Sequence, residues 1–181
     1  MGKVVVLVGS MRMNGNTRIL AERFADGASE NNSVEIVSIS DYKVNPCTGC
    51  NRCYSSEGDV CIQRDDMDAI YAKLADADVL AIASPVYFYG LSAGLKAIID
   101  RLHTPMRNTF GIRQLALLLV GATEVPKLFA SIEMQYESAL EFFHLKDAGR
   151  VLVGGVKDAG DIIGDPKLDE AYLLGKSIRR P

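Results

Sequence analysis

Four cysteines are the residues whose spacing could most directly support chemistry. The pattern C-x2-C-x2-C-x7-C is made by Cys47, Cys50, Cys53 and Cys61, and the chain contains four cysteines in all. Two-residue spacers let successive thiolates approach one centre, and four thiolates suit a [4Fe–4S] cluster or Zn²⁺. The triplet is more typical of cluster ligation than of the paired C-x2-C motifs of zinc ribbons. Free thiols and a disulfide pair are the alternatives.

A second candidate site is the segment GSMRMNGNT at residues 9–17, which follows an apolar run and leads into a helical pattern. Small and hydroxyl-bearing residues at a helix start leave backbone N–H groups and the positive end of the helix dipole facing an anion. The residues expected to bind a phosphate are Ser10, Arg12, Asn14, Gly15, Asn16 and Thr17. A capped loop without a ligand is the alternative, because Ser, Asn and Thr are common helix caps. The segment lacks the P-loop lysine and the spacing GxGxxG, so it fits neither an ATP nor a dinucleotide motif.

Two further loops have the composition of a pocket for a flat ring. One follows an apolar run and consists of Pro85, Val86, Tyr87, Phe88, Tyr89 and Gly90. Three adjacent aromatics cannot all enter one core, so some of them should line a pocket or an interface; a hydrophobic plug is the alternative. The other loop, Gly121, Ala122 and Thr123, leaves room for a ring near the backbone. One ligand with a phosphate at one end and a planar ring at the other would contact all three loops.

The elements that must position these loops alternate along the chain. Apolar runs predict buried strands and helical patterns predict helices; the strands are 4–8, 34–39, 78–83, 114–120 and 150–153, and the helices 17–24, 65–75, 93–102, 131–144 and 167–178. Apolar strands alternating with helices predict an α/β fold of three layers around a doubly wound, parallel, five-stranded sheet. Ligands bind beyond the carboxyl ends of such strands, where the three loops would lie. Residues 41–64, which hold the cysteines, show neither period and form an excursion from a single domain expected over 1–181.

The motifs, in this order, resemble those of the NADPH-dependent FMN reductase group. GSMRMNGNT is similar to the flavin-phosphate loop of that group, usually GSPRxxGNT, with Met11 in place of the proline. SPVYFYGLSAGLKAIIDR is similar to the second flavin loop and the helix after it. The resemblance implies a flavodoxin-like sheet in the order 2-1-3-4-5. It also implies an FMN phosphate on Ser10, Arg12, Asn16 and Thr17 and an isoalloxazine ring against residues 85–90 and 121–124.

The cysteine run, followed by the helix start at Asp65-Asp66-Met67, resembles the iron–sulfur flavoproteins, a branch of the same group. In that branch a [4Fe–4S] cluster passes electrons to FMN. The resemblance implies an FMN-dependent oxidoreductase with its chemistry at flavin N5, no catalytic side chain, and a redox partner such as a ferredoxin. The alternatives are an NAD(P)H-dependent FMN or quinone reductase without a cluster, and a non-enzymatic zinc-binding module. A homodimer or homotetramer is also implied.

The net charge and the hydropathy of the chain limit the kinds of partner that it is expected to bind. A net charge of −3 argues against nucleic acid or an anionic membrane surface as the main partner. No apolar run approaches the roughly 20 residues that span a bilayer, so a cytoplasmic protein is expected. Among weaker candidates, Asp65, Asp66 and Asp68 are interpreted as a helix-capping device and His103 as structural. Lys157-Asp158 and the last helix are interpreted as a solvated face, and no motif is recognised in the last sixty or so residues.

Overall fold

Five parallel strands form the central sheet of the computed structural model, which describes residues 1–180. The strands are β1 (Gly2–Val8), β2 (Asn32–Ser38), β3 (Val79–Tyr87), β5 (Gln114–Val120) and β6 (Lys146–Val153). Their order is β2-β1-β3-β5-β6, and the two-residue strand β4 (Gly90–Leu91) pairs with β3 outside this path. With β4 set aside, this is the order 2-1-3-4-5, which confirms the predicted flavodoxin-like fold class.

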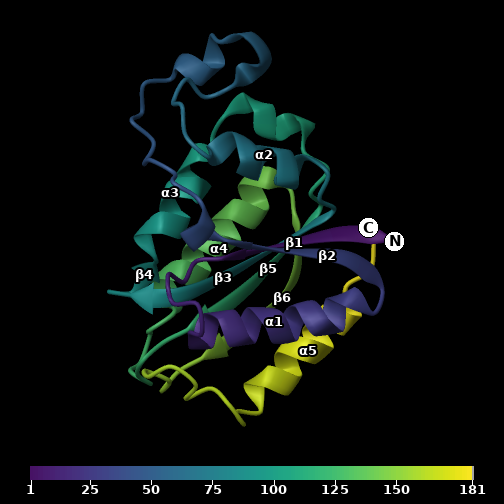
Figure 1. Ribbon diagram of the computed structural model, residues 1–181, viewed down its shortest axis with the longest axis vertical. Helices are drawn as coiled ribbons and strands as arrows, with labels where there is room; N and C mark the ends of the chain where they lie inside the picture. Colours follow the sequence, from purple (N-terminus) through teal and green to yellow (C-terminus); the bar gives the residue numbers. More distant parts are fainter. Residues whose placement is uncertain (181) are drawn as a thin grey trace.

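Helices cover both faces of the sheet (Figure 1). One face carries α1 (Asn16–Ser29) and α5 (Lys167–Ser177), and the other carries α2 (Met67–Ala75), α3 (Ala93–Arg101) and α4 (Ala130–Phe143). Side chains of a strand alternate between the two faces, so a strand covered on both sides must be apolar at every position. In β1, Val4, Val6 and Val8 enter the first core, whereas Val5 and Leu7 enter the second.

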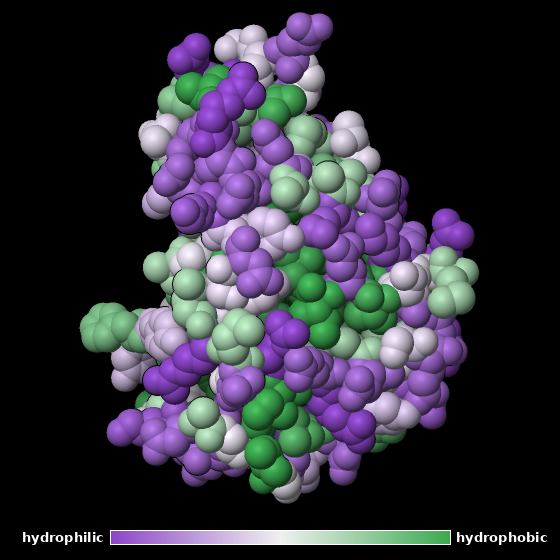
Figure 2. Space-filling model, viewed as in Figure 1, coloured by the Kyte–Doolittle hydropathy of each residue, from purple (hydrophilic) through white to green (hydrophobic). Residues whose placement is uncertain are grey.

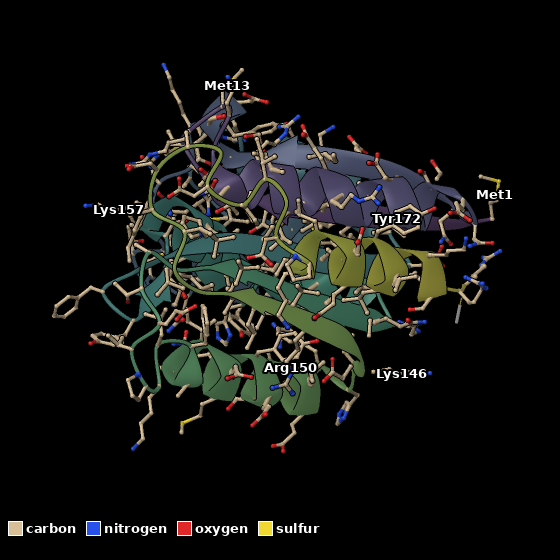
Figure 3. The ribbon with its side chains drawn as sticks, turned by 90° about the horizontal axis from the view of Figure 1, so that it is seen from below. Met1, Met13, Lys146, Arg150, Lys157 and Tyr172 are labelled. Carbon is tan, nitrogen blue, oxygen red and sulfur yellow. The ribbon has the colours of Figure 1, made fainter. Side chains whose placement is uncertain are left out.

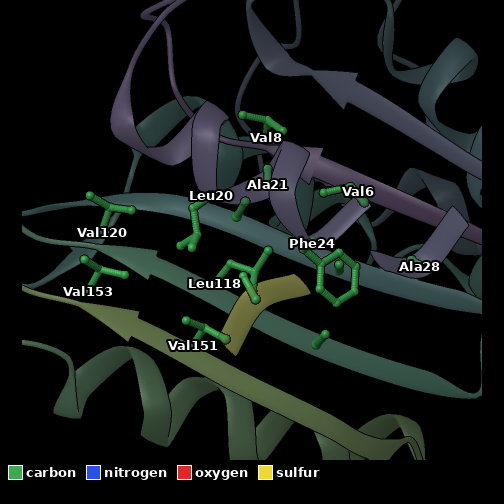
Figure 4. Close-up of a cluster of buried hydrophobic side chains, with 14 of the residues drawn as sticks. Val6, Val8, Leu20, Ala21, Phe24, Ala28, Leu118, Val120, Val151 and Val153 are labelled. Carbon is green, nitrogen blue, oxygen red and sulfur yellow. The ribbon is translucent and has the colours of Figure 1, made fainter. Parts of the chain in front are cut away.

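The first core lies between the sheet and the pair formed by α1 and α5. Figure 4 shows Leu20, Ala21 and Phe24 of α1 above Leu118 and Val151 of the sheet. These residues are at most 3% exposed. The helical spacing of Leu20, Ala21 and Phe24 therefore sets the rotation of α1, and with it the position of the loop that precedes this helix.

Two strands differ in length from the sequence-based prediction. β3 continues four residues past its expected end, because Val86 and Tyr87 pair antiparallel with Leu91 and Gly90 of β4. β6 begins four residues before its expected start, and the register of its pairing with β5 shifts at Leu115/Ala116. Such an irregularity inserts a residue into the pattern, which conceals the strand from a search for continuous apolar runs.

The excursion lies at the top of the view in Figure 1, beyond the ends of α2 and α3. It consists of connecting segments and short 3-10 turns, including Arg52–Tyr54 and Glu57–Asp59. Over residues 1–180, no helix combines the length and the apolar character needed to cross a membrane.

Candidate functional site

The loops after β1, β3 and β5 meet at one edge of the sheet. Val8 pairs with Ala83, and Pro85 pairs with Val120, so the carboxyl ends of the three strands are aligned. Neighbouring strands lie about 4.8 Å apart, which places the loops side by side. The structure thus brings together the three loops that the sequence singled out.

Figure 3 shows this edge from below. Met13, in the loop after β1, and Lys157, in the segment after β6, lie at one end of the molecule. Met1 and Lys146, which precede or begin strands, lie at the opposite end. The carboxyl edge is therefore bordered by a fourth segment, residues 154–162, in which the sequence showed no motif.

The loop after β1 folds into a tight turn that leads into α1. The backbone N–H of Arg12 donates to Ser10 Oγ at 3.1 Å, and that of Gly15 donates to the Arg12 carbonyl at 3.2 Å. A Cβ atom at Gly15 would lie 3.0 Å from Arg12 Cβ and 3.2 Å from Ser10 Oγ, so the turn has little room for a side chain. Arg12 and Asn14 are exposed, whereas Ser10 and Thr17 are buried.

The amino terminus of α1 has no side-chain cap. Gly15 is the N-cap residue, the helix has no side-chain cap, and its first turn carries no acidic residue. The first N–H groups of a helix have no intrahelical partner, and the helix dipole places positive charge there. The side-chain cap that the alternative interpretation assumed is therefore not formed, and the phosphate site stays a prediction.

The side chain of Asn16 has a different role from the expected one. Its Nδ2 donates to the Asp158 carbonyl at 2.8 Å, and its Oδ1 accepts from the Gly160 N–H at 2.9 Å. The amide is thus committed to the segment after β6, and only the backbone N–H of Asn16 remains for a phosphate. Arg12 also reaches this segment, since its Nη1 donates to the Lys157 carbonyl at 3.3 Å.

Residues 154–162 were missed by sequence reasoning, and Lys157-Asp158 is more than a solvated face. Asp161 Oδ2 accepts from the N–H groups of Lys157 and Asp158, at 3.0 and 2.7 Å, and closes a turn that offers its carbonyls to the loop after β1. The sequence does contain a turn signal here, because glycine and aspartate cluster after a strand. That signal predicts a turn but not its partner, which is more than 140 residues away along the chain.

The aromatic loop forms an exposed hairpin. Phe88 and Tyr89 have φ values of 49° and 64°, as the two central residues of a type I′ turn require. Tyr87, Phe88 and Tyr89 are 55%, 98% and 51% exposed, so the plug considered from sequence is not formed. Figure 2 shows an apolar group protruding where Figure 1 places the β3–β4 hairpin. The carbonyl of Tyr89 accepts a hydrogen bond from Ser131 Oγ, which ties the hairpin to α4.

Serine hydroxyls join the first two loops. Ser92 Oγ donates to the Gly9 carbonyl at 2.6 Å, and the Ser92 N–H donates to Ser84 Oγ at 3.1 Å. Ser84 and Ser92 are buried, so the hydrogen bonds are protected from water. They fix the loop after β1 against the start of α3 and the base of the hairpin.

The backbone of Gly121 in the third loop is hydrogen-bonded within the protein. Its N–H donates to the Val153 carbonyl at 2.8 Å, and its carbonyl accepts from the Val156 N–H at 3.1 Å. The N–H of Gly121 is therefore not available to a flavin. A Cβ atom at this glycine would lie 2.4 Å from Leu128 Cδ2, which explains the small residue. Ala122 and Thr123 are exposed and remain the candidates for a contact with a ring.

The four cysteines line one cavity of about 70 Å³ at the carboxyl end of α3. All four are free thiols; Cys47 and Cys50 are exposed, and Cys53 and Cys61 are half-buried. Within residues 1–180, no three His, Cys, Asp or Glu side chains are close enough to bind one metal ion as they stand. Binding a metal centre therefore requires the thiols to turn toward the cavity that they share.

The backbone of the cysteine run is shaped to donate to sulfur. Gly49 and Asn51 have φ values of 65° and 57°, and the Gly49 N–H donates to Cys47 Sγ at 3.5 Å. The pKa of the Cys50 thiol is lowered, because the Arg52 N–H and then the Thr48 hydroxyl hydrogen-bond to it. Left-handed residues can turn neighbouring N–H groups to one side, as in anion-binding nests. This chemistry fits a set of thiolate ligands.

A buried ion pair fastens the excursion to α3. Arg101 Nη1 lies 2.5 Å from Asp65 Oδ2, and the two side chains are 1% and 5% exposed. Asp65 also accepts from the N–H groups of Asn45 and Met67, at 2.9 and 3.2 Å. Burial raises the pKa of Asp65, but the hydrogen bonds from Arg101, Asn45 and Met67 outweigh it and lower the pKa.

The acidic residues before α2 therefore do more than cap a helix. The predicted helix at 65–75 begins at Met67, and its N-cap residue, Asp66, makes no side-chain capping bond. Asp66 Oδ2 instead accepts from the Lys43 N–H at 2.7 Å. Asp65 combines one bond to the helix start with bonds to the excursion, and sequence reasoning missed its partner Arg101.

Two tyrosines form hydrogen bonds at the carboxyl end of α3. The Tyr54 hydroxyl lies 2.9 Å from His103 Nε2, which gives this histidine the structural position expected of it. The Tyr71 hydroxyl donates to the Arg101 carbonyl at 2.7 Å, and burial raises the pKa of Tyr71 to about 12. Tyr54 thus ties the cysteine run to the end of α3, and Tyr71 ties α2 to the same end.

A larger cavity, of about 330 Å³, lies at the opposite edge of the sheet. It is lined by the end of α4, the turn at 105–109 and the first residues of β3 and β5. No residue of the three loops at the carboxyl edge lines it. It is therefore not part of the candidate site.

The sheet order, the two helical layers and an uncapped helix start at the carboxyl edge define a flavodoxin-like α/β domain. The fold is shared by the NAD(P)H:quinone oxidoreductase of Methanothermobacter marburgensis, with a TM-score of 0.77 and 17% identity over 98% of this chain and 99% of that chain. The family model for NADPH-dependent FMN reductase matches residues 2–153. The chain belongs to this family, which confirms the resemblance seen in its motifs and makes it a flavin-dependent oxidoreductase using FMN and NAD(P)H.

Proteins that are similar to this chain in sequence carry two kinds of name. An iron-sulfur flavoprotein of Archaeoglobus fulgidus is 39% identical over 97% of this chain and 78% of its own length. An iron-sulfur flavoprotein of Methanocaldococcus jannaschii is 41% identical over 61% of this chain, and the match spans only 56% of that relative. A putative NAD(P)H-dependent FMN-containing oxidoreductase of Bacillus subtilis is 26% identical over 90% of each chain.

Proposed function

We propose that this enzyme binds FMN at the carboxyl edge of its sheet and a [4Fe–4S] cluster at Cys47, Cys50, Cys53 and Cys61. The proposed cluster site rests on the observation that all four cysteines line one cavity. When bound, the two groups would supply electron transfer between the cluster and the flavin. The names of two similar archaeal proteins support the assignment of a cluster.

The residues at the carboxyl edge would bind and orient the flavin. Arg12 and the N–H groups at the start of α1 would hold the phosphate, within a turn shaped by Ser10, Asn14 and Gly15 and followed by Thr17. The hairpin Pro85–Gly90 and the loop at Ala122–Thr123 would lie against the ring. No side chain acts as an acid or base in this proposal, because the reactive atoms belong to the cofactor.

Helix α3 would link the two sites. It begins directly after Ser92, which bonds to both flavin loops, and ends at Arg101 in the cysteine cavity. Nine residues at about 1.5 Å each give it a length of roughly 13 Å. A rigid element of this length would hold the two sites at a fixed separation within one chain.

A reductase without a cluster is the second candidate. One reason is the placement of the cysteines, since no three of them converge as they stand in the described chain. The other is the similar protein of Bacillus subtilis, whose name mentions no cluster. This candidate would reduce FMN or a quinone with NAD(P)H. A zinc-binding module would use the same thiols, and metal analysis separates it from both.

We also propose a cytoplasmic location, a single domain over residues 1–181, and a redox-protein partner such as a ferredoxin. Four free thiols are consistent with a reducing compartment. The exposed hairpin supports a homodimer or homotetramer, because an aromatic side chain that is 98% exposed at Phe88 is costly to leave in water.

The test is anaerobic purification followed by a visible spectrum and by iron, zinc and acid-labile sulfide analysis. Flavin bands with broad absorption that bleaches on reduction, and four iron and four sulfide per chain, are expected. Cys53→Ser should lose iron and keep FMN, whereas Ser55→Ala, a matched change beside the run, should keep both. Flavin with no metal would favour the reductase, and zinc without sulfide would favour the module.

A further inference from the structure

The guanidinium of Arg101 carries donors that have no partner. Nε and Nη2 of Arg101 are the only buried side-chain nitrogen or oxygen atoms in residues 1–180 that make no hydrogen bond. A guanidinium has five N–H bonds, and here those on Nη1 serve Asp65 and, at 3.4 Å, the Asn45 carbonyl. Three N–H bonds of a buried cation are thus left over.

Buried donors on a charged group are rarely left unsatisfied, because burial removes the water that would otherwise bind them. Pairing with Asp65 alone does not require an arginine, since a lysine ammonium also pairs with a carboxylate. The ion pair therefore does not explain why Nε and Nη2 of Arg101 are present and buried. An acceptor bound beside these atoms of Arg101 would explain it.

The acceptor should lie in the cysteine cavity. Arg101 lines this cavity together with Cys47, Cys50, Cys53 and Cys61. Burial lowers the pKa of Arg101, but Asp65 and then Cys61 outweigh it and raise the pKa, so Cys61 lies near the guanidinium. Two other polar side chains at the cavity already have partners of their own, since Asp100 pairs with Lys96 and the His103 ring bonds to Tyr54.

We propose that Arg101 is a positioning residue that donates its free N–H bonds to sulfur of the cysteine-held centre and offsets its negative charge. This inference rests on the proposed function, since it takes the [4Fe–4S] cluster as the centre. The potential of a cluster depends on net charge, on hydrogen bonds to its sulfurs and on exposure to solvent. A buried cation favours the reduced, more negative state, and so it raises the reduction potential.

The test compares Arg101→Gln and Arg101→Lys with wild type after anaerobic reconstitution. Arg107→Gln is the matched control, because Arg107 does not line the cysteine cavity. Retention of FMN shows that each variant is folded. The reduction potential of the cluster is measured by spectroscopic redox titration, and iron and sulfide are counted before and after gel filtration.

Arg101→Gln should lower the potential enough to change the ratio of reduced to oxidised cluster at least tenfold, which is about 59 mV for one electron. Arg101→Lys keeps a positive charge but loses the fork, so a smaller shift is expected. Arg107→Gln should leave the potential unchanged. If the Gln variant does not fold, the Lys variant decides, and a potential equal to that of wild type overturns the inference.

Failure of this inference differs from failure of the proposed function. Wild-type protein that holds no iron or sulfide after reconstitution overturns both. Wild-type protein with a full cluster, and an Arg101→Gln variant that is folded, loaded and unchanged in potential, overturns only the role of Arg101. A purely structural role would lower stability through Asp65 without moving the potential.

Discussion

Gly27 and Gly175 face each other where α1 crosses α5. A Cβ atom at Gly27 would lie 2.0 Å from the Tyr172 carbonyl oxygen, and one at Gly175 would lie 2.0 Å from the Phe24 carbonyl oxygen. Both atoms that would clash belong to the backbone, which cannot turn away as a side chain can. The two helices therefore pack backbone to backbone, and this contact fixes how closely α1 and α5 lie together on the sheet.

Gly175→Ala should destabilise the protein by at least the 1–3 kcal/mol or so that overpacking typically costs. The reason is that a methyl group at Gly175 forces α5 away from α1 and opens the first core. The measurement is urea unfolding of the protein without added FMN. Leu173→Ala is the control on the same helix, since Leu173 is 62% exposed, and its effect should stay within about 0.5 kcal/mol. Equal effects of the two changes would contradict the backbone contact.

Arg12→Ala combined with Thr17→Ala should weaken FMN binding by one to two orders of magnitude. Hydrogen bonds to charged groups contribute about 1.5–3 kcal/mol each, and about 1.4 kcal/mol is tenfold in affinity. The readout is quenching of flavin fluorescence on titration. Arg18→Ala is the matched control, because it removes a cation from the same helix end while Arg18 is paired with Glu22. An unchanged affinity in the double variant would exclude the phosphate assignment.

The sheet and its helices could be predicted because their signals are local. Continuous apolar runs at β1 and β5 mark strands buried on both faces, and the ends predicted for β5 are those observed. The hairpin after β3 could not be placed in the same way. Its second strand, β4, has only two residues, which is too short for a period to be recognised. Phe88 and Tyr89 adopt positive φ values, which bulky aromatic residues do not lead one to expect.

The site was less predictable because its contacts join residues far apart in the chain. The residue types of the loop after β1 indicated an anion site, but nothing local shows that Asn16 bonds to Asp158 and Gly160. In the same way, the acidic residues before α2 were interpreted as a helix cap. Arg101, the partner of Asp65, is 36 residues away, and only the fold brings the two together.

Asn16→Asp should separate the two possible roles of Asn16. The aspartate keeps the acceptor for the Gly160 N–H, loses the donor to the Asp158 carbonyl, and adds negative charge at the helix start. FMN affinity should therefore fall strongly, because the phosphate would meet a carboxylate. Asn16→Ala should lower the free energy of unfolding by about 1–3 kcal/mol, since it leaves buried groups unpaired, with a smaller loss of affinity.

The measurements for both Asn16 variants are flavin fluorescence titration and limited proteolysis of the segment at 154–162. Cleavage in this segment should increase in Asn16→Ala, because the Asp158 carbonyl and the N–H groups of Gly160 and Ile162 lose their bonds to the Asn16 side chain. Asn31→Ala serves as a control, because the half-buried Asn31 side chain donates to the Lys176 carbonyl near the far end of α1. Similar affinities for the Ala and Asp variants would argue against a phosphate at this helix start.

The Asp65–Arg101 ion pair should make stability depend on pH in the acid range. The pKa of Asp65 is lowered in the folded protein, against about 3.9 when unfolded. Such a carboxylate contributes its full stability above the unfolded pKa and loses it as the pH falls through the folded pKa. Removing one partner of a buried pair costs about 3–5 kcal/mol, so Asp65→Asn should be strongly destabilised at neutral pH and less so near pH 2.

Urea unfolding between about pH 2 and 7 tests this dependence. The difference in unfolding free energy between wild type and Asp65→Asn should shrink as the pH falls below about 4, because the unfolded wild type then takes up a proton at Asp65 that the folded protein binds only at lower pH. Asp68→Asn is the control in the same helix turn, since Asp68 is exposed, and its difference from wild type should stay small at every pH. A constant difference between wild type and Asp65→Asn across the range would mean that the charge of Asp65 does not stabilise the fold, and that its hydrogen bonds to Asn45 and Met67 hold the excursion in place without it.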